Sequence, residues 1–240
     1  MNSKKLLRQT EFDENQLLKR IARSLMLHSS FLSNIGLLNG KTGISIFFYH
    51  YARHTGKRIY DDFAGELLDE IYTEIHANSP VNFKDGLCGI GWGIEYLIRN
   101  QFIEGNPDKV LADLDKQIVE RDVRRISDDS LETGLAGIAC YVISRMENRG
   151  KEHEYIRLDY IYDLIEALNG RKEDTPLALI EALGNIVQGK KINHSYNPIF
   201  NIVDKIKYNQ KTILEPSRLL GIAEAGYAGI GLQLMGIGKK

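Results

Sequence analysis

A short phrase, Gly-x-x-Gly-Ile, returns four times along the chain and restricts the possible folds more than any other feature. The copies begin at Gly40, Gly86, Gly134 and Gly226, and their second glycines are Gly43, Gly89, Gly137 and Gly229. The first three copies start about 46 residues apart, and the last interval is about twice as long. A fixed period of this length predicts a repeat architecture in which each repeat is one supersecondary unit.

The segments between the phrases have the apolar spacing of helices. Four of them carry apolar residues on one face and polar residues on the other, at residues 12–27, 60–76, 110–119 and 155–168. The segments that follow the phrases at Ile44, Ile90 and Ile138 are apolar on nearly all sides, as is typical of buried helices. We therefore predict an all-α protein in which each period holds one amphipathic outer helix and one buried inner helix.

One copy of the phrase is missing from the regular series. The long interval predicts a degenerate repeat at residues 176–189, where Gly184 and Gly189 remain but the phrase does not. Counting this copy gives about five helix hairpins, which we assign to a single domain over residues 1–240.

Composition excludes several classes of function. Lys and Arg number 31 and Asp and Glu number 32, so no basic surface for nucleic acid or anionic membrane is expected. No apolar run reaches the ~18 residues of a membrane span, and the first residues lack the apolar stretch of a signal peptide. Two cysteines are too few for a disulfide framework. We expect a cytoplasmic protein with no nucleic-acid or membrane partner.

The glycine phrases, read with their flanks, resemble the repeats of the lanthionine synthetase C-like (LanC-like) family. The resemblance covers roughly residues 30–240 and rests on four phrases in phase. It implies an α/α toroid whose inner helices begin at the repeat glycines around a common mouth. Complete toroids of this family have seven hairpins, so about five would leave a ring that is open, smaller, or completed by a partner or a second copy of the chain.

The resemblance also implies a metal site. Enzymes of this family cyclise precursor peptides by adding a cysteine thiol to a dehydroamino acid, with a zinc ion bound by two cysteines and a histidine. One of these cysteines stands two residues before a repeat glycine, and a Cys-His pair directly precedes another. The corresponding pairs here contain no Cys or His, and they are Leu38-Asn39, Lys84-Asp85, Glu132-Thr133 and Glu224-Ala225. We therefore expect no zinc and no other cofactor.

Four residues near the repeat glycines are candidates for other chemistry. Asp85, Glu132 and Glu224 precede repeat glycines, where carboxylates either cap helix starts or line a cleft for acid–base hydrolysis like that of glycosidases. Cys88 lies within the second phrase, where a helix start could activate its thiol; the alternative is a small buried side chain. His50 and His54 have the spacing of a metal-binding pair but no evident third ligand.

Three functions remain open from the sequence. The first is a zinc-free accessory protein, a pseudoenzyme of peptide modification that binds a precursor peptide or a modification enzyme. The second is an enzyme that uses the cleft carboxylates. The third is a structural component that assembles through an open ring end. A fold that hosts unrelated activities does not decide among them.

Overall fold

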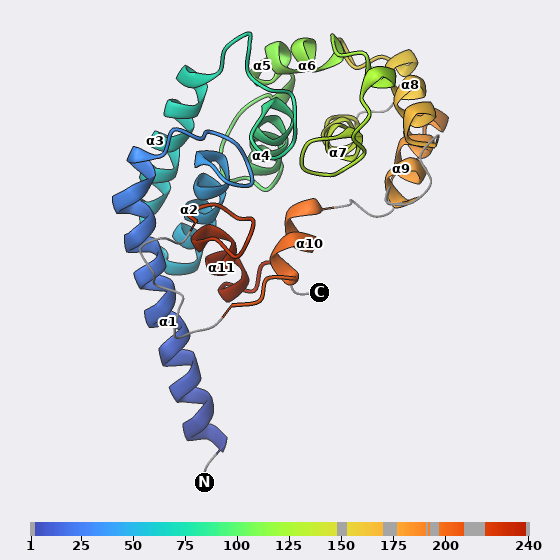
Figure 1. Ribbon diagram of the computed structural model, residues 1–240. Coiled ribbons are helices and arrows are strands. Elements are labelled where there is room, and N and C mark those ends of the chain that lie inside the picture. Colours follow the sequence, from blue (N-terminus) through green and yellow to red (C-terminus); the bar gives the residue numbers. More distant parts are fainter. Residues whose placement is uncertain are drawn as a thin grey trace. The chain divides into compact units, whose positions relative to one another are not determined.

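The computed structural model describes residues 3–147, 153–169, 177–190, 192, 197–208 and 219–238, with side chains from Glu14 onward. These residues form eleven α-helices and two 3₁₀ helices and contain no β-strand (Figure 1). The α-helices are α1 (Ser3–His28), α2 (Lys41–Thr55), α3 (Arg58–Glu74), α4 (Leu87–Arg99), α5 (Pro107–Val110), α6 (Ala112–Val119), α7 (Leu135–Met146), α8 (Leu158–Asn169), α9 (Leu177–Gln188), α10 (Pro198–Asp204) and α11 (Tyr227–Leu234). The 3₁₀ helices are η1 (Ser29–Phe31) and η2 (Val123–Arg125).

The helix order confirms the all-α prediction. Each glycine phrase opens a helix, namely α2, α4, α7 and α11, and the missing copy corresponds to α9. A helix with a polar side precedes each of these in the chain, which gives five pairs among the described residues. This succession is compatible with the α/α toroid of LanC-like proteins. Whether a ring closes, and whether the chain forms one domain, stay predictions.

Burial separates the two kinds of helix. In α7 every residue from Leu135 to Met146 is buried, whereas α3 buries only Ala64, Leu67 and Ile71. The difference follows from the sequence, because α7 has no polar face and α3 carries its acidic residues on one side. The outer helix α3 thus exposes one side to solvent, whereas the inner helix α7 is enclosed on all sides.

The chain forms two compact units. Unit 1 contains residues 1–34, 39–71 and 199–240, and unit 2 contains residues 35–38 and 72–198. In unit 1, α11 packs against both α1 and α2. A side chain at Gly231 of α11 would collide with the Phe47 ring of α2, so glycine allows the two helices to approach closely.

In unit 2, α4 and α7 lie side by side (Figure 1). The same device joins them, because a side chain at Gly91 of α4 would collide with the Tyr141 ring of α7. Helix α9 packs against α7, and α8 packs against α9. The degenerate repeat therefore keeps its contact with α7 although its glycine phrase is gone, but α9 is less enclosed than α7 and buries Leu179, Ala182, Leu183 and Ile186.

Candidate functional site

The repeat glycines begin the inner helices and are held there by the loops before them. Gly40, Gly86, Gly134 and Gly226 are the N-cap residues of α2, α4, α7 and α11, and none has a side chain to cap its helix. The first helical N–H groups donate instead to loop carbonyls. These hydrogen bonds run from Lys41 to Asn34 (2.9 Å), Leu87 to Pro80 (2.8 Å), Leu135 to Asp128 (2.9 Å) and Tyr227 to Leu219 (2.9 Å). At these N–H groups the acceptors are loop carbonyls and not the capping carboxylates considered above.

This arrangement explains why two glycines are needed in the second, third and fourth phrases. A Cβ atom at Gly86, Gly134 or Gly226 would lie closer than 3.0 Å to a carbonyl oxygen of the preceding loop. A Cβ atom at the second glycines Gly89, Gly137 and Gly229 would do the same. The glycines are therefore required because the loop backbone passes within contact distance of the first helical turn, where a side chain would not fit.

Successive loops of unit 2 are also joined to each other. The Leu38 N–H donates to the Lys84 carbonyl at 2.8 Å, and the Lys84 N–H donates to the Glu132 carbonyl at 2.8 Å. A Cβ at Gly89 would collide with Leu37, and one at Gly137 would collide with Phe83. We call these three joined loops, residues 35–38, 80–86 and 128–134, the loop ladder.

The loop ladder carries two of the three candidate carboxylates. The Lys84 Nζ lies 2.7 Å from the Glu132 Oε2, and 47% of the Glu132 side chain is exposed. Asp85 is the next residue, and its Cα lies against Gly36 of the first loop so closely that a Cβ at Gly36 would collide with it. Asp85 and Glu132 thus stand on adjacent loops of the ladder.

Glu224, the third candidate carboxylate, belongs to unit 1 and has an unusual backbone. Glu224 and Ala225 have φ angles of 53° and 55°, in the left-handed region that non-glycine residues seldom adopt. Such residues cost of order 1 kcal/mol or more each, so the loop before α11 is held in place by its surroundings. Those surroundings include the Tyr227 and Ala228 N–H groups, which bond to Leu219 and Leu220.

Both cysteines are enclosed. Cys88 and Cys140 are buried free thiols on the facing helices α4 and α7. Burial raises the pKa of both thiols, which favours the neutral form over the reactive thiolate. The Cys88 N–H, at the helix start, already donates to the Val81 carbonyl at 3.2 Å. Both residues therefore occupy the environment of small packed core side chains.

The residues at the ligand positions do not fit the zinc ion that the resemblance implies. Lys84 and Glu132 stand two residues before repeat glycines and pair with each other, and a lysine ammonium repels a metal cation. Zinc sites in proteins of this kind use thiolate and imidazole ligands, which these positions do not offer. Within the described part of the chain, no group of three or more His, Cys, Asp or Glu residues is arranged to hold a metal ion. The expectation that the chain binds no cofactor stays a prediction.

The two histidines of α2 show no sign of acting as ligands together. Burial, and then the nearby Arg53 charge, lower the pKa of His50 to about 4. The ring of His54 stacks against Tyr51 at a centroid distance of 6.4 Å. His50 is therefore a neutral, largely enclosed side chain at ordinary pH.

The sequence analysis missed a buried cluster of charges in unit 2. At its centre the Arg145 guanidinium, fully buried on α7, donates to the carboxylates of Glu95 at 2.8 Å and Asp115 at 2.6 Å. It also reaches Asp108 at 3.1 Å, and the Tyr141 hydroxyl donates to Asp115 at 2.5 Å. Burial alone would lower the pKa of Arg145, but the hydrogen bond and charge of Asp115 raise it. The arginine therefore stays charged among its carboxylates.

His153 joins this cluster through both of its ring nitrogens. Its Nδ1 lies 3.3 Å from the Tyr155 backbone nitrogen and 3.1 Å from that of Ile156. Its Nε2 lies 3.0 Å from the Arg145 Nη2 and 3.5 Å from the Asp115 carboxylate. The histidine thus fixes the segment before α8 to the cluster.

A sequence signal for the cluster existed. Glu95 and Arg145 are isolated charges within inner helices that are otherwise apolar, and they lie on neighbouring repeats. An isolated charge on such a helix must find an opposite charge on the helix beside it, because an unpaired buried charge is too costly. The large aromatic side chains of the same two inner helices, Tyr141 and Trp92, are core side chains with 0% and 5% exposure.

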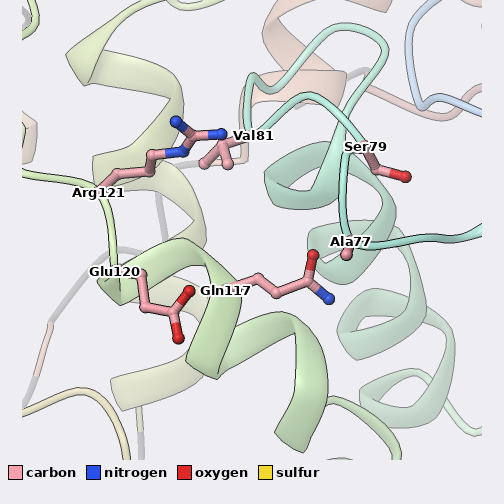
Figure 2. Close-up of a pocket in the computed structure, with 6 residues that line it drawn as sticks. All are labelled: Ala77, Ser79, Val81, Gln117, Glu120 and Arg121. Carbon is pink, nitrogen blue, oxygen red and sulfur yellow. The ribbon is translucent and has the colours of Figure 1, made fainter.

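A surface groove lies beside α6 in unit 2. It has a volume of about 700 Å³ and is lined by the end of α3, the segment after it, α5 and α6. The apolar part consists of Tyr72, Ile75, Val110 and Leu114, and the charged part consists of Lys109, Asp113, Lys116 and Glu120. A smaller pocket of about 190 Å³ continues from it and adds Ser79, Val81 and Arg121 (Figure 2). We call the two together the α6 groove; the sequence analysis had no signal for it.

The fold and the loop ladder define an all-α helix-hairpin repeat protein in which paired glycines begin the inner helices. Comparison with protein families agrees: residues 33–197 match the model of the family described as lanthionine synthetase C-like protein. The match covers more than half of the chain, so the protein belongs to the LanC-like family, as the glycine phrases predicted. None of the curated proteins matches the sequence. No helix in the described residues is long and apolar enough to cross a membrane.

Proposed function

We propose that this chain is a zinc-free LanC-like protein that binds a precursor peptide or protein partner and does not catalyse cyclisation. The observation that carries the proposal is that none of the residue pairs directly before the four repeat glycines contains Cys or His, and that two of these residues, Lys84 and Glu132, pair with each other. Cyclisation in this family needs a metal-bound thiolate, and neither side chain can take part in it. Partner binding needs only the helical scaffold and its surfaces.

The hydrolase alternative finds less support. It needs a pair of carboxyl groups about 5–9 Å apart, of which one acts as the acid. The Glu132 carboxylate already forms an ion pair with the Lys84 ammonium. Glu224 belongs to unit 1, whereas Asp85 and Glu132 belong to unit 2. The third possibility, assembly through a ring end, has no observation that favours it over partner binding.

Metal content tests the zinc-free part of the proposal. The chain is purified, equilibrated with zinc, passed through a desalting column and measured by mass spectrometry for bound metal. We expect far less than one zinc per chain, because none of the residue pairs before the repeat glycines contains Cys or His. A stoichiometry near one would overturn the proposal.

Peptide capture tests the binding part. Affinity-purified chain is examined by mass spectrometry for a peptide that stays bound, and the same is done for a Cys88→Ala variant. We expect the same peptide on both proteins, since Cys88 is a buried thiol. Loss of the peptide from a folded Cys88→Ala variant would instead favour thiol chemistry.

A further inference from the structure

We propose that the α6 groove binds an acidic peptide segment that carries one bulky apolar side chain. The inference rests on the proposed function and adds to it the place of binding and the kind of peptide. The groove lies entirely in unit 2 and does not involve the loop ladder.

The apolar part of the groove offers a place for a large side chain. Two large hydrophobic side chains on the surface, Tyr72 and Val110, line the same groove and are 74% and 43% exposed. Ile75 and the buried Leu114 extend this apolar surface. A volume of about 700 Å³ is sufficient for a side chain with its flanking backbone.

The charged part of the groove favours carboxylates. Lys116 lies three residues after Asp113 on α6, a spacing at which opposite charges on a helix usually attract, and Lys109 lies on the neighbouring helix α5. Yet in the described part of the chain the side chain of neither lysine forms an ion pair or hydrogen bond, and that of Arg121 in the adjoining pocket forms none either. In Figure 2 the Arg121 guanidinium lies beside Val81, and the Glu120 carboxylate turns toward Gln117. Three cations therefore remain available to an acidic ligand.

Two carboxylates share the lining, so the charge preference is limited. Against the three cations stand Asp113 and Glu120, which leaves a small positive excess. We therefore assign most of the affinity to the apolar side chain and the choice of acidic over basic peptides to the cations. The Gln117 side-chain amide, which faces Ala77 in Figure 2, can both donate to and accept from a peptide backbone.

The test uses two synthetic probes and matched variants of the full chain. Both probes are short labelled peptides with the same central leucine and tryptophan; one is flanked by glutamates and the other by lysines. Binding to wild type is measured by fluorescence anisotropy at low and at moderate salt. The groove variants are Tyr72→Ser and the double variant Lys109→Glu with Lys116→Glu. The control is Lys57→Glu with Lys205→Glu, which makes the same charge change at exposed lysines of unit 1.

The proposal predicts that the acidic probe binds wild type and the control more tightly than the basic probe does. Tyr72→Ser should weaken binding ~10-fold through loss of an aromatic contact. The lysine double variant should weaken acidic-probe binding ~5-fold or more and reverse the preference between probes, with the effect reduced by salt. Helix content by circular dichroism confirms that each variant is folded.

Two outcomes would overturn the inference. If the acidic probe binds the groove variants as well as wild type, the peptide binds elsewhere, and the proposed function stands on its captured peptide. If neither probe binds wild type, the groove is not a peptide site, whatever the metal and capture experiments show about the function.

Discussion

The two units of this protein enclose very different cores. Unit 1 contains a cluster of aromatic rings, among them Phe48 edge-on to Phe63 at a centroid distance of 4.9 Å and Tyr51 tilted against Tyr60 at 4.6 Å. Unit 2 has ring contacts around Trp92 as well, but it also buries the Arg145 guanidinium with the carboxylates of Asp115 and Glu95. Both units are built on glycine-started inner helices. The repeat therefore determines the order of the helices but not which side-chain interactions stabilise them.

The difference lies in how each core responds to change. Aromatic packing leaves no charge behind when a ring is replaced, so an apolar side chain of similar volume retains most of the packing free energy. A buried ion cluster depends on every member, because the removal of one leaves the others charged and unpaired in a medium of low polarity. We therefore expect substitutions at a few positions of unit 2 to cost much stability, and substitutions at many core positions of unit 1 to cost little.

The largest expected effect follows from Arg145→Met. The change leaves Asp115 without the Arg145 cation, while Glu95 still pairs with Arg99 at 3.4 Å, and we expect it to lower the free energy of unfolding by ~3–5 kcal/mol. Trp92, the one tryptophan of the chain, lies in unit 2, so its fluorescence during urea denaturation reports this loss. Arg124→Met is the control, since Arg124 pairs with Asp122 at the exposed surface, where solvent screens the interaction and its loss should matter little. Equal effects of the two variants would show that the cluster is not what stabilises unit 2.

Unit 1 has its own titratable group in His50, which predicts a dependence on pH. Burial lowers the pKa of His50 from 6.5 to about 4, so the imidazole is neutral in the folded state at pH 7. Between those two values the unfolded chain binds a proton that the folded chain does not, and stability therefore falls as the pH falls through this range. Allowing for its partial exposure, the loss is about 2 kcal/mol, and it is absent above pH 6.5.

The variant His50→Gln tests this dependence. Urea denaturation followed by circular dichroism at pH 7 and pH 4.5 should show a smaller loss of stability for the variant than for wild type. The same loss in both proteins would mean that other groups cause the acid sensitivity.

Tolerance of the aromatic core predicts a smaller effect for Phe48→Leu. Phe48 is fully buried, and its ring contacts Phe47, Tyr60 and Phe63. Leucine keeps most of the volume and loses the ring contacts, so we expect a cost of about 1 kcal/mol. Circular dichroism should detect it in unit 1. A loss as large as that of Arg145→Met would remove the distinction between the two cores.

The sequence predicted the helices, their order and the family, because apolar periodicity and paired glycines are local patterns. It did not predict the loop carbonyls that cap the inner helices, since Pro80 and Asp128 carry no sign of which N–H groups their oxygens will accept. Nor did it predict the cluster around Arg145. Asp108 and His153 reach that arginine from segments whose own sequences are ordinary polar loops and helix starts. The pairing of such residues depends on tertiary structure, which no short-range pattern encodes.

The smallest effect expected is a gain in stability, and it tests what the glycine phrases are for. Gly184 lies inside α9, the helix of the degenerate repeat, and a Cβ there would meet no atom within 4 Å. Gly184→Ala should therefore raise the free energy of unfolding by ~0.5–1 kcal/mol, because alanine favours the helix and nothing opposes it. In Gly137→Ala the new Cβ would meet the Leu131 carbonyl and Phe83 at less than 3.0 Å, so the same exchange should destabilise by ~1–3 kcal/mol. Trp92 fluorescence in urea measures both variants in unit 2. A gain in stability at Gly184 with a loss at Gly137 would show that the glycine phrase is needed where a loop contacts the helix. A gain in stability at both positions would show that the glycines are not required for packing.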